Sequence, residues 1–201
     1  MKSIALLLAL GLLFCSCSAL SKEYPDKRYF GLKASRPGSP KSHPGDLVLK
    51  VRQFEASRKY EGQELVYRQG EIDWASDYYH VFFMPPADLA TEEAIVWLKD
   101  TGLFAQVVPQ TSRLKPTHYL EGYVVSLYGD YSDEADPRAV LELGILVIDE
   151  REAGTRVVLQ RAYRREKPLP DNSVEELVRA YHGAFADILT ELESDLSTAL
   201  R

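Results

Sequence analysis

The sequence predicts a single α/β domain in which a mixed β-sheet is flanked by helices. Three observations indicate this class. Apolar and polar residues alternate along residues 47–54, three segments between residues 118 and 164 are dense in β-forming residues, and a long helical repeat closes the chain. Strands and helices that alternate early, followed by a sheet and a covering helix, are typical of one layered α/β fold.

Short strands are expected in the first part of the chain. Residues 29–32 are expected to form a first strand, and the crowded prolines and glycines of residues 35–45 predict a loop. The alternating segment 47–54 predicts the next strand. Further strands are expected at residues 65–68 and in the aromatic stretch 78–84, because Val, Tyr and Phe favour extended chain.

One helix is expected among these strands. Pro85 and Pro86 end the aromatic strand and begin the helix, because proline suits a first helical turn but not a helix interior. Apolar residues at helical spacing continue the helix towards Gly102, which is expected at its C-cap. Residues 104–108 predict another strand, so the helix is expected to cover one face of the sheet.

Three strands of the second half are expected to form an antiparallel meander. They occupy residues 118–128, 138–149 and 156–164, and their connections at 129–137 and 150–155 are too short for helical crossovers. In the middle strand, four aliphatic residues are expected to share one face. They are Leu141, Leu143, Ile145 and Val147.

The chain closes with its clearest amphipathic helix. Ser173 and Glu176 have the spacing of a capping box at the helix start. Apolar residues then recur every three or four positions, which predicts a helix long enough to pack across a whole sheet. They are Val174, Leu177, Val178, Tyr181, Phe185, Ile188, Leu192 and Leu196.

Composition narrows the function classes. The chain has 201 residues, 45% of them hydrophobic, and a net charge of -6. The acidic balance, with Lys and Arg scattered among acids, argues against nucleic-acid binding. The only cysteines are Cys15 and Cys17, so the chain beyond Cys17 can contain neither a disulfide framework nor a cysteine zinc site.

The first stretch, MKSIALLLALGLLFCSCS, is typical of an export signal. Lys2 precedes an apolar run that is too short to span a bilayer and that ends in small residues. In bacterial lipoproteins, the lipidated cysteine becomes the first mature residue and follows a small residue. Ser16 precedes Cys17 whereas Phe14 precedes Cys15, so Cys17 is the predicted lipidation site. An ordinary signal peptide with incidental cysteines is the alternative.

This prediction divides the chain into three parts. Residues 1–16 form the signal peptide, residues 17–28 contain the lipidated cysteine and a tether, and residues 29–201 form the domain. The basic stretch 22–36 could lie against anionic headgroups, the alternative being a solvated linker. An extended tether from Cys17 to Tyr29 reaches at most about 40 Å, so the domain is expected to work close to its membrane.

No catalytic or metal-binding motif stands out. The histidines are His43, His80, His118 and His182, which form no i,i+4 pair and fit no catalytic motif. The acidic run at 130–136 lacks the alternating ligands and central glycine of an EF-hand, so a solvated hairpin turn is expected. No nucleophile elbow, P-loop or dinucleotide motif occurs. We therefore expect no enzymatic activity, no metal site and no cofactor.

The candidate contact residues form an aromatic cluster. Such side chains combine a large apolar area with polar tips, which suits contact with acyl chains or with a partner protein. The alternative is that alternate members fill the core beneath the first helix. The Tyr-rich strand at 119–128 leaves the same two interpretations open. The members of the cluster are Tyr78, Tyr79, Phe82, Phe83 and Met84.

An ordered series of short landmarks runs through nearly the whole mature chain. It consists of Tyr29-Phe30-Gly31-Leu32, the strand at 47–54, Leu65-Val66-Tyr67-Arg68, Gly102-Leu103-Phe104 with Val107, Leu120-Glu121-Gly122-Tyr123-Val124, Ala139-Val140-Leu141-Glu142-Leu143 and the terminal helix. This series resembles the auxiliary lipoproteins of ABC-type transport systems, which work with MCE-domain proteins to move lipid between membranes. One departure is Phe83-Met84-Pro85-Pro86, where the family often shows Trp-Ala-Glu-Pro, so contacts of that tryptophan and glutamate do not carry over.

The resemblance implies a fold similar to the N-terminal domain of the TolB periplasmic protein, and a non-enzymatic role. The protein would be anchored in the outer membrane, facing the periplasm, with an MCE-domain protein and an ABC permease and ATPase as partners. Ser18 replaces the aspartate that retains lipoproteins at the inner membrane, which by resemblance favours the outer membrane. A homo-oligomer is compatible with this role. The alternatives are a lipid-binding carrier and a general envelope-assembly lipoprotein outside any transporter.

Overall fold

A computed structural model of the chain describes residues 26–41, 45–151 and 154–200. The predicted signal peptide and lipidation site, with Cys15 and Cys17, lie outside the described residues, as does His43. The elements are β1 (Arg28–Phe30), β2 (Val48–Val51), β3 (Glu55–Ala56), a 3-10 turn (Arg58–Tyr60), β4 (Glu64–Arg68), β5 (Trp74–Phe82), α2 (Pro86–Lys99), β6 (Gln106–Pro109), β7 (His118–Asp130), β8 (Arg138–Asp149), β9 (Arg156–Pro168) and α3 (Val174–Ala199).

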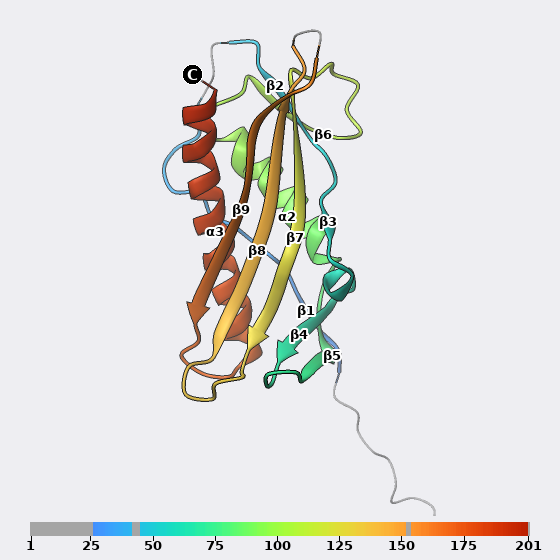
Figure 1. Cartoon of the computed structure of the whole chain (residues 1–201), viewed down its shortest axis with the longest axis vertical. Coiled ribbons are helices and arrows are strands. Elements are labelled where there is room, and N and C mark those ends of the chain that lie inside the picture. The colour runs from blue at the N-terminus through green and yellow to red at the C-terminus, as the bar shows by residue number, and fades with distance from the viewer. Residues whose placement is uncertain (1–25, 42–44, 152–153, 201) are drawn as a thin grey trace, which may run out of the picture.

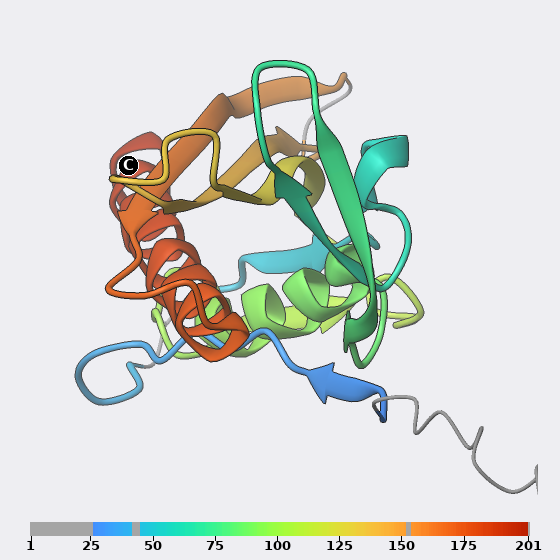
Figure 2. The same ribbon diagram turned by 90° about the horizontal axis from the view of Figure 1, so that it is seen from below.

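The strands form one mixed sheet built around β7 (Figure 1). One edge of β7 pairs antiparallel with β8, which pairs antiparallel with β9, so the predicted meander is confirmed. The other edge of β7 is shared by β2, β3 and β4, which all run parallel to it. β6 lies beyond β2, whereas β5 and then β1 lie beyond β4. Seen from below, the sheet curls around the helices (Figure 2), which confirms the predicted single α/β domain.

Both α2 and α3 pack on the same, inner face of the curled sheet. α3 contacts β8 and β9, whereas α2 contacts β6 and β7. Burying this interface removes large side chains from water, and that transfer is the main stabilising contribution in a domain of this size. The largest fully buried side chains include Trp97, Phe82, Tyr163, Tyr181 and Phe185.

The predicted apolar stripe of α3 is confirmed. Each of its eight residues is buried except Val174, which is partly buried against the core. The helix begins after Ser173, whose Oγ accepts a hydrogen bond from the Glu176 amide at 3.3 Å. The second half of the capping box does not form, because the Ser173 amide donates to Asp171 instead.

Acidic side chains of α3 face basic side chains of β9. Arg161 pairs with Asp195 at 2.8 Å, and Lys167 pairs with Asp187 at 2.5 Å. The Tyr163 hydroxyl also donates to Asp195, at 2.7 Å. These pairs are partly exposed and each stabilises the domain by about 0–1 kcal/mol, so they orient α3 more than they stabilise it.

The predicted strand at 47–54 is in fact two strands. β2 ends at Val51 and β3 begins at Glu55. The chain leaves the sheet between them because the Phe54 amide donates to Thr91 Oγ1 of α2, at 2.9 Å. The Phe54 ring then lies against Gly122 of β7. A contact between distant segments therefore overrides the local alternation.

Other predicted boundaries were also wrong, and three of them have clear structural causes. β5 begins at Trp74 rather than at residue 78, because its first residues pair with β4 in a hairpin. α2 ends at Lys99 with Asp100 as its C-cap, and Gly102 adopts a positive φ of 68° in the loop that follows. β9 continues past residue 164 to Pro168, because its pairing with β8 extends to Arg138.

Candidate functional site

The predicted aromatic cluster lies on β5, next to the short edge strand β1. β1 pairs in parallel with the last residues of β5, from His80 to Phe82. On its other side, β5 pairs with β4 irregularly: Glu64 lies opposite Val81, and Val66 lies opposite Ser76. Residues 77–80 therefore face a single residue of β4, which makes a wide β-bulge. Bulges of this kind are frequent near sheet edges, where they redirect side chains.

The carboxylate of Asp77 organises this bulge. Its Oδ1 accepts hydrogen bonds from the amides of Tyr79 at 2.8 Å and His80 at 3.0 Å. Its Oδ2 accepts a hydrogen bond from the Tyr67 hydroxyl at 2.8 Å and lies 2.8 Å from His80 Nδ1. Burial alone would raise the pKa of Asp77, but these hydrogen bonds outweigh burial and lower the pKa. The bulge is therefore a built feature rather than an irregular loop.

Three exposed aromatic side chains lie on β1, in the bulge and directly after β5. The exposed fractions are 59% for Tyr29, 66% for Tyr78 and 68% for Phe83. The rings of Tyr29 and Phe83 are in edge contact at 6.4 Å, and the ammonium of Lys27 lies 4.2 Å from the centroid of the Tyr78 ring. We call Tyr29, Tyr78 and Phe83 the aromatic patch. The cluster predicted from the sequence contains Tyr78 and Phe83 but lacks Tyr29, Lys27 and Asp77.

Of the other predicted contact residues, the structure places Phe82 and Met84 in or against the core and Tyr79 beside the patch. Phe82 is 1% exposed and lies against Tyr181 of α3, so it belongs to the core and cannot contact a partner. Met84 is partly buried against the same core. Tyr79 is half-buried, and its ring is in edge contact with Tyr78 at 5.2 Å. The alternative interpretation, in which some members fill the core, therefore applies to Phe82 and Met84.

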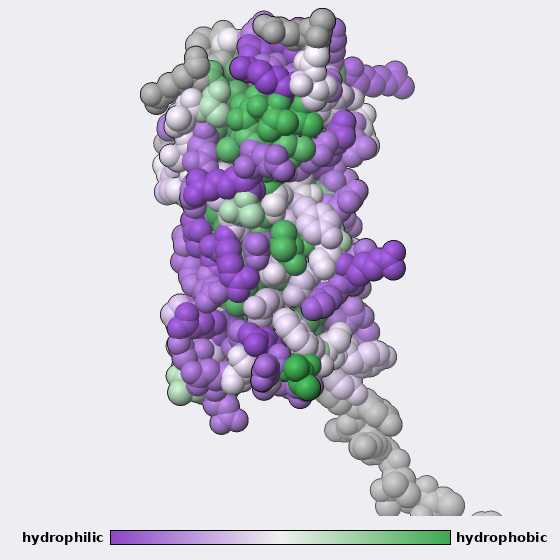
Figure 3. All heavy atoms as spheres, in the orientation of Figure 1, coloured by the Kyte–Doolittle hydropathy of each residue, from purple (hydrophilic) through white to green (hydrophobic). Residues whose placement is uncertain are grey.

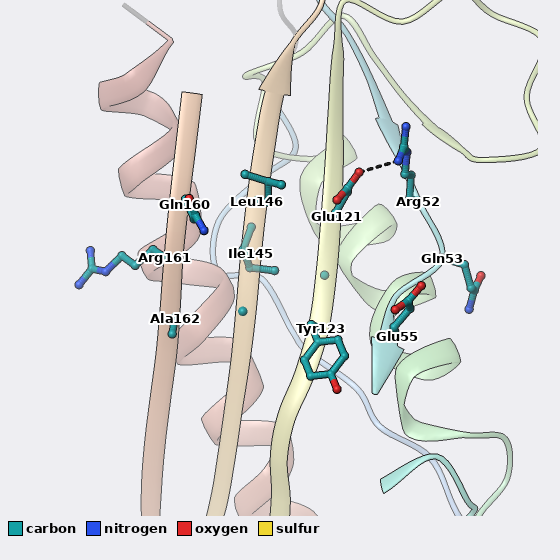
Figure 4. Close-up of a pocket in the computed structure, with 12 residues that line it drawn as sticks. Arg52, Gln53, Glu55, Glu121, Tyr123, Ile145, Leu146, Gln160, Arg161 and Ala162 are labelled. Atoms are coloured by element: carbon teal, nitrogen blue, oxygen red, sulfur yellow. Dashed lines mark hydrogen bonds and ion pairs between the residues drawn. The ribbon is translucent and has the colours of Figure 1, made fainter. Parts of the chain in front are cut away.

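A groove of about 640 Å³ lies on the outer face of β7, β8 and β9, which is the face that points away from α2 and α3 (Figure 4). Gly144 and Ala162 line it and leave it hollow, while Tyr123, 42% exposed, and Glu121 project from β7. Arg52 pairs with Glu121 at 2.6 Å on the side of β2. Charged, amide, aromatic and small residues are thus mixed in one shallow surface.

Apolar side chains extend this outer face beyond the groove. Leu146 and Ile148 of β8 are half-buried, and Val157 of β9 is 54% exposed. Figure 3 shows a hydrophobic patch over the upper part of the face, surrounded by hydrophilic residues. Apolar patches with a polar rim are typical of surfaces that bind other proteins. Tyr123, an outward residue of the Tyr-rich strand, lies on this face and is available for contact with a partner.

A buried histidine lies at the same end of the meander as Ile148 and Val157. His118 of β7 is fully buried, its Nδ1 is 2.9 Å from Thr117 Oγ1, and its Nε2 is 3.8 Å from Asp149 Oδ2. Hydrogen bonds from Arg151 and Arg156 hold the pKa of Asp149 far below its usual value, and burial lowers the pKa of His118. His118 is therefore neutral near pH 7, in a packed environment that a substrate could not reach.

Two further searches concern the described part of the chain alone. Within it, no group of three or more His, Cys, Asp or Glu residues is placed to bind a metal ion. None of the helices there is both long enough and apolar enough to cross a membrane.

Comparisons with known proteins support the fold. No protein-family model matches the chain, and no curated protein is significantly similar to it. Among solved structures, protein XCC0632 from Xanthomonas campestris, family DUF330, has a TM-score of 0.70 and 18% identity, with 82% of this chain and 92% of that chain covered. An uncharacterized protein has a TM-score of 0.66 and 14% identity, covering 84% and 97% of the two chains. Hypothetical protein CT253 from Chlamydia trachomatis has a TM-score of 0.51 and 9% identity, covering 77% and 99%. At these identities the likeness establishes the fold alone.

Proposed function

We propose that this protein is a non-enzymatic lipoprotein of the outer membrane that faces the periplasm and serves an ABC transport system for lipid. In this proposal its partners are an MCE-domain protein and, through it, the permease and ATPase. The predicted lipidation site at Cys17 and the ordered landmarks of the sequence support the proposal. The fold shared with a DUF330 protein is compatible with it.

The observation that carries the docking role is the groove on the outer face. Its lining combines the Arg52–Glu121 ion pair with Gln160, Tyr123 and the small residue Gly144. Mixed charges and amides at the rim of an apolar surface are typical of sites that bind polypeptide, because such sites must satisfy backbone and side-chain hydrogen bonds. An acyl chain would offer no hydrogen-bond partner to the Gln160 amide or the Tyr123 hydroxyl.

The packing of the core supports a docking module over a lipid carrier. The space between the sheet and the helices is occupied by the fully buried side chains of Trp97, Tyr163, Tyr181 and Phe185. The aromatic cluster, which would line the cavity of a carrier, is instead divided between that core and the exterior. A carrier would need a concave, largely apolar site that encloses most of its ligand.

Isolation of the full-length, acylated protein from crosslinked membranes tests the proposal. An affinity tag at the C-terminus should recover an MCE-domain protein together with the permease or the ATPase, identified by mass spectrometry. Repeated recovery without any of these components would refute the transport role. Native mass spectrometry of the same preparation discriminates the carrier alternative, since a carrier should retain stoichiometric phospholipid beyond its own acyl chains.

A further inference from the structure

We propose that the aromatic patch, Tyr29, Tyr78 and Phe83, rests in the headgroup layer of the membrane that holds the lipid anchor. The inference rests on one part of the proposed function, the acylation of Cys17, and adds the orientation of the domain on its membrane. In this inference, the exposed residues of the predicted aromatic cluster contact a phospholipid surface rather than a protein.

The composition of the patch is that of a membrane interface. Aromatic rings are enriched where membrane meets water, because they have an apolar body and, in tyrosine, a polar tip. Here all three side chains are more than half exposed, with Tyr29 on β1, Tyr78 in the bulge of β5 and Phe83 directly after β5, which pairs with β1. Two edge contacts between rings, Tyr29 with Phe83 and Tyr78 with Tyr79, add to this aromatic surface.

A cation lies within the patch. The Lys27 ammonium is stacked on the Tyr78 ring, 4.2 Å from its centroid. A lysine that lies on an aromatic ring can reach phosphate groups while its aliphatic stem stays on apolar surface. Such a cation near an anionic membrane adds about 1 kcal/mol of attraction.

Two acidic groups close to the patch are held by other groups of the protein. Glu175 of α3 pairs with Arg28 at 2.5 Å, so these two charges offset each other. Asp77 stays charged, but both of its carboxylate oxygens accept hydrogen bonds within the bulge. His80 lies beside Asp77, so its ring also belongs to this internal network. Repulsion between Glu175 and anionic lipid is therefore reduced.

The length of chain between the anchor and the patch limits where the patch can lie. Nine peptide steps separate Cys17 from Asp26, which is the first described residue. Fully extended, they reach at most about 32 Å, which is comparable to the thickness of a bilayer core. Lys27, the next residue, already contacts Tyr78. An anchor at Cys17 therefore confines the patch, rather than the far end of the meander, to the vicinity of the membrane.

Spin labels offer a direct test, because the mature chain has no cysteine other than the acylated Cys17. The acylated full-length protein with Tyr78→Cys or Phe83→Cys would be labelled with a nitroxide and reconstituted into vesicles of phosphatidylethanolamine and phosphatidylglycerol. Collision with oxygen and with a water-soluble nickel chelate then reports depth. Val96→Cys on α2, where the native side chain is 56% exposed, is the matched control.

The expected result is that labels at positions 78 and 83 become at least threefold less accessible to the nickel chelate in vesicles, with retained access to oxygen, while position 96 stays aqueous. Labels at 78 and 83 that are as accessible to the chelate as the label at 96 would overturn the proposal. Loss of access to both reagents would also overturn it, since that pattern indicates coverage by protein.

The outcomes separate this inference from the transport role. The vesicles contain no MCE or ABC component, so a failure to isolate such partners leaves the seating on the membrane unaffected. An intact mass without acyl chains would refute both the anchor and the seating. An acylated protein with aqueous labels would refute the seating alone.

Discussion

Gly122 of β7 and Gly144 of β8 are neighbours in the sheet but have different surroundings. A Cβ placed on Gly122 would lie 2.5 Å from atoms of the Phe54 ring, which is closer than real contacts allow. A Cβ placed on Gly144 would make only ordinary contacts at 3.9 Å with Tyr123 and Val125. The first glycine is therefore required by packing, whereas the second shapes the floor of the groove.

We expect Gly122→Ala to lower the free energy of unfolding by about 1–3 kcal/mol, because Phe54 must move. Gly144→Ala should change it by no more than about 0.5 kcal/mol, as is usual at sites without a clash. Urea denaturation of the two variants checks this. Equal losses of unfolding free energy in the two variants would show that the close approach of Phe54 to Gly122 does not limit the residue at position 122.

His118 predicts a pH dependence of stability. Burial lowers the pKa of His118 in the folded protein below its usual 6.5. At a pH between the folded and unfolded pKa values, the unfolded chain therefore binds more protons than the folded chain. Stability increases with pH over that interval. The charged groups that face the histidine are Asp149 of β8, Arg151 of the following turn and Arg156 of β9. The stability present above pH 6.5 should therefore be lost as the pH falls through the lowered folded pKa.

Unfolding measured between pH 7.5 and pH 5 checks this expectation. The unmodified protein should lose more stability over this interval than His118→Asn, which cannot titrate. Asp149 does not contribute to the difference, because its lowered pKa lies far below this window. Identical slopes for the two proteins would contradict a neutral, buried His118.

At the scale of elements, α3 covers β8 and β9 on the inner face of the sheet and buries an apolar stripe there. Ile188 is fully buried between α3 and the sheet, whereas Ser194 is exposed on the same helix. We expect Ile188→Ala to lower the free energy of unfolding by about 2–5 kcal/mol, from lost transfer energy and a residual cavity. Ser194→Ala should be nearly neutral. Chemical denaturation measures both, and comparable losses would be inconsistent with burial as the source of stability.

Elements determined by local pattern could be predicted from the sequence. The meander and α3 followed from runs of β-formers and from a sustained helical repeat, and the structure confirms both. The split of residues 47–54 could not be predicted, because it depends on a hydrogen bond from Phe54 to Thr91 on a different element. Periodicity contains no information about such partners.

The candidate sites were likewise predictable where they depend on local sequence and not where they depend on contacts between distant segments. The aromatic cluster was visible in the sequence, but the bulge that divides it depends on Asp77 bonding to Tyr67 of the neighbouring strand. Tyr29 was missed because its contact with Phe83 exists only once β1 pairs with β5. The outer groove was missed because it is formed by side chains from three strands that are adjacent only in the folded sheet.

At the scale of the whole molecule, the proposed anchor at Cys17 would tether the domain at one end. Cys17→Ser should abolish acylation and release a folded domain from the membrane fraction, because Cys15 lies in the proposed signal peptide. Intact mass and fractionation measure this. If acylation persisted in Cys17→Ser and disappeared in Cys15→Ser, the lipidated residue would be Cys15.

The central claim is that the outer face docks a component of a lipid-transport system. A photo-crosslinking amino acid at position 123, in the full-length protein in its own cells, tests it most directly; position 96 on α2 is the control. The account predicts that position 123, but not position 96, forms an adduct with an MCE-domain protein. An anchored protein whose position 123 crosslinks to no MCE, permease or ATPase component would contradict it.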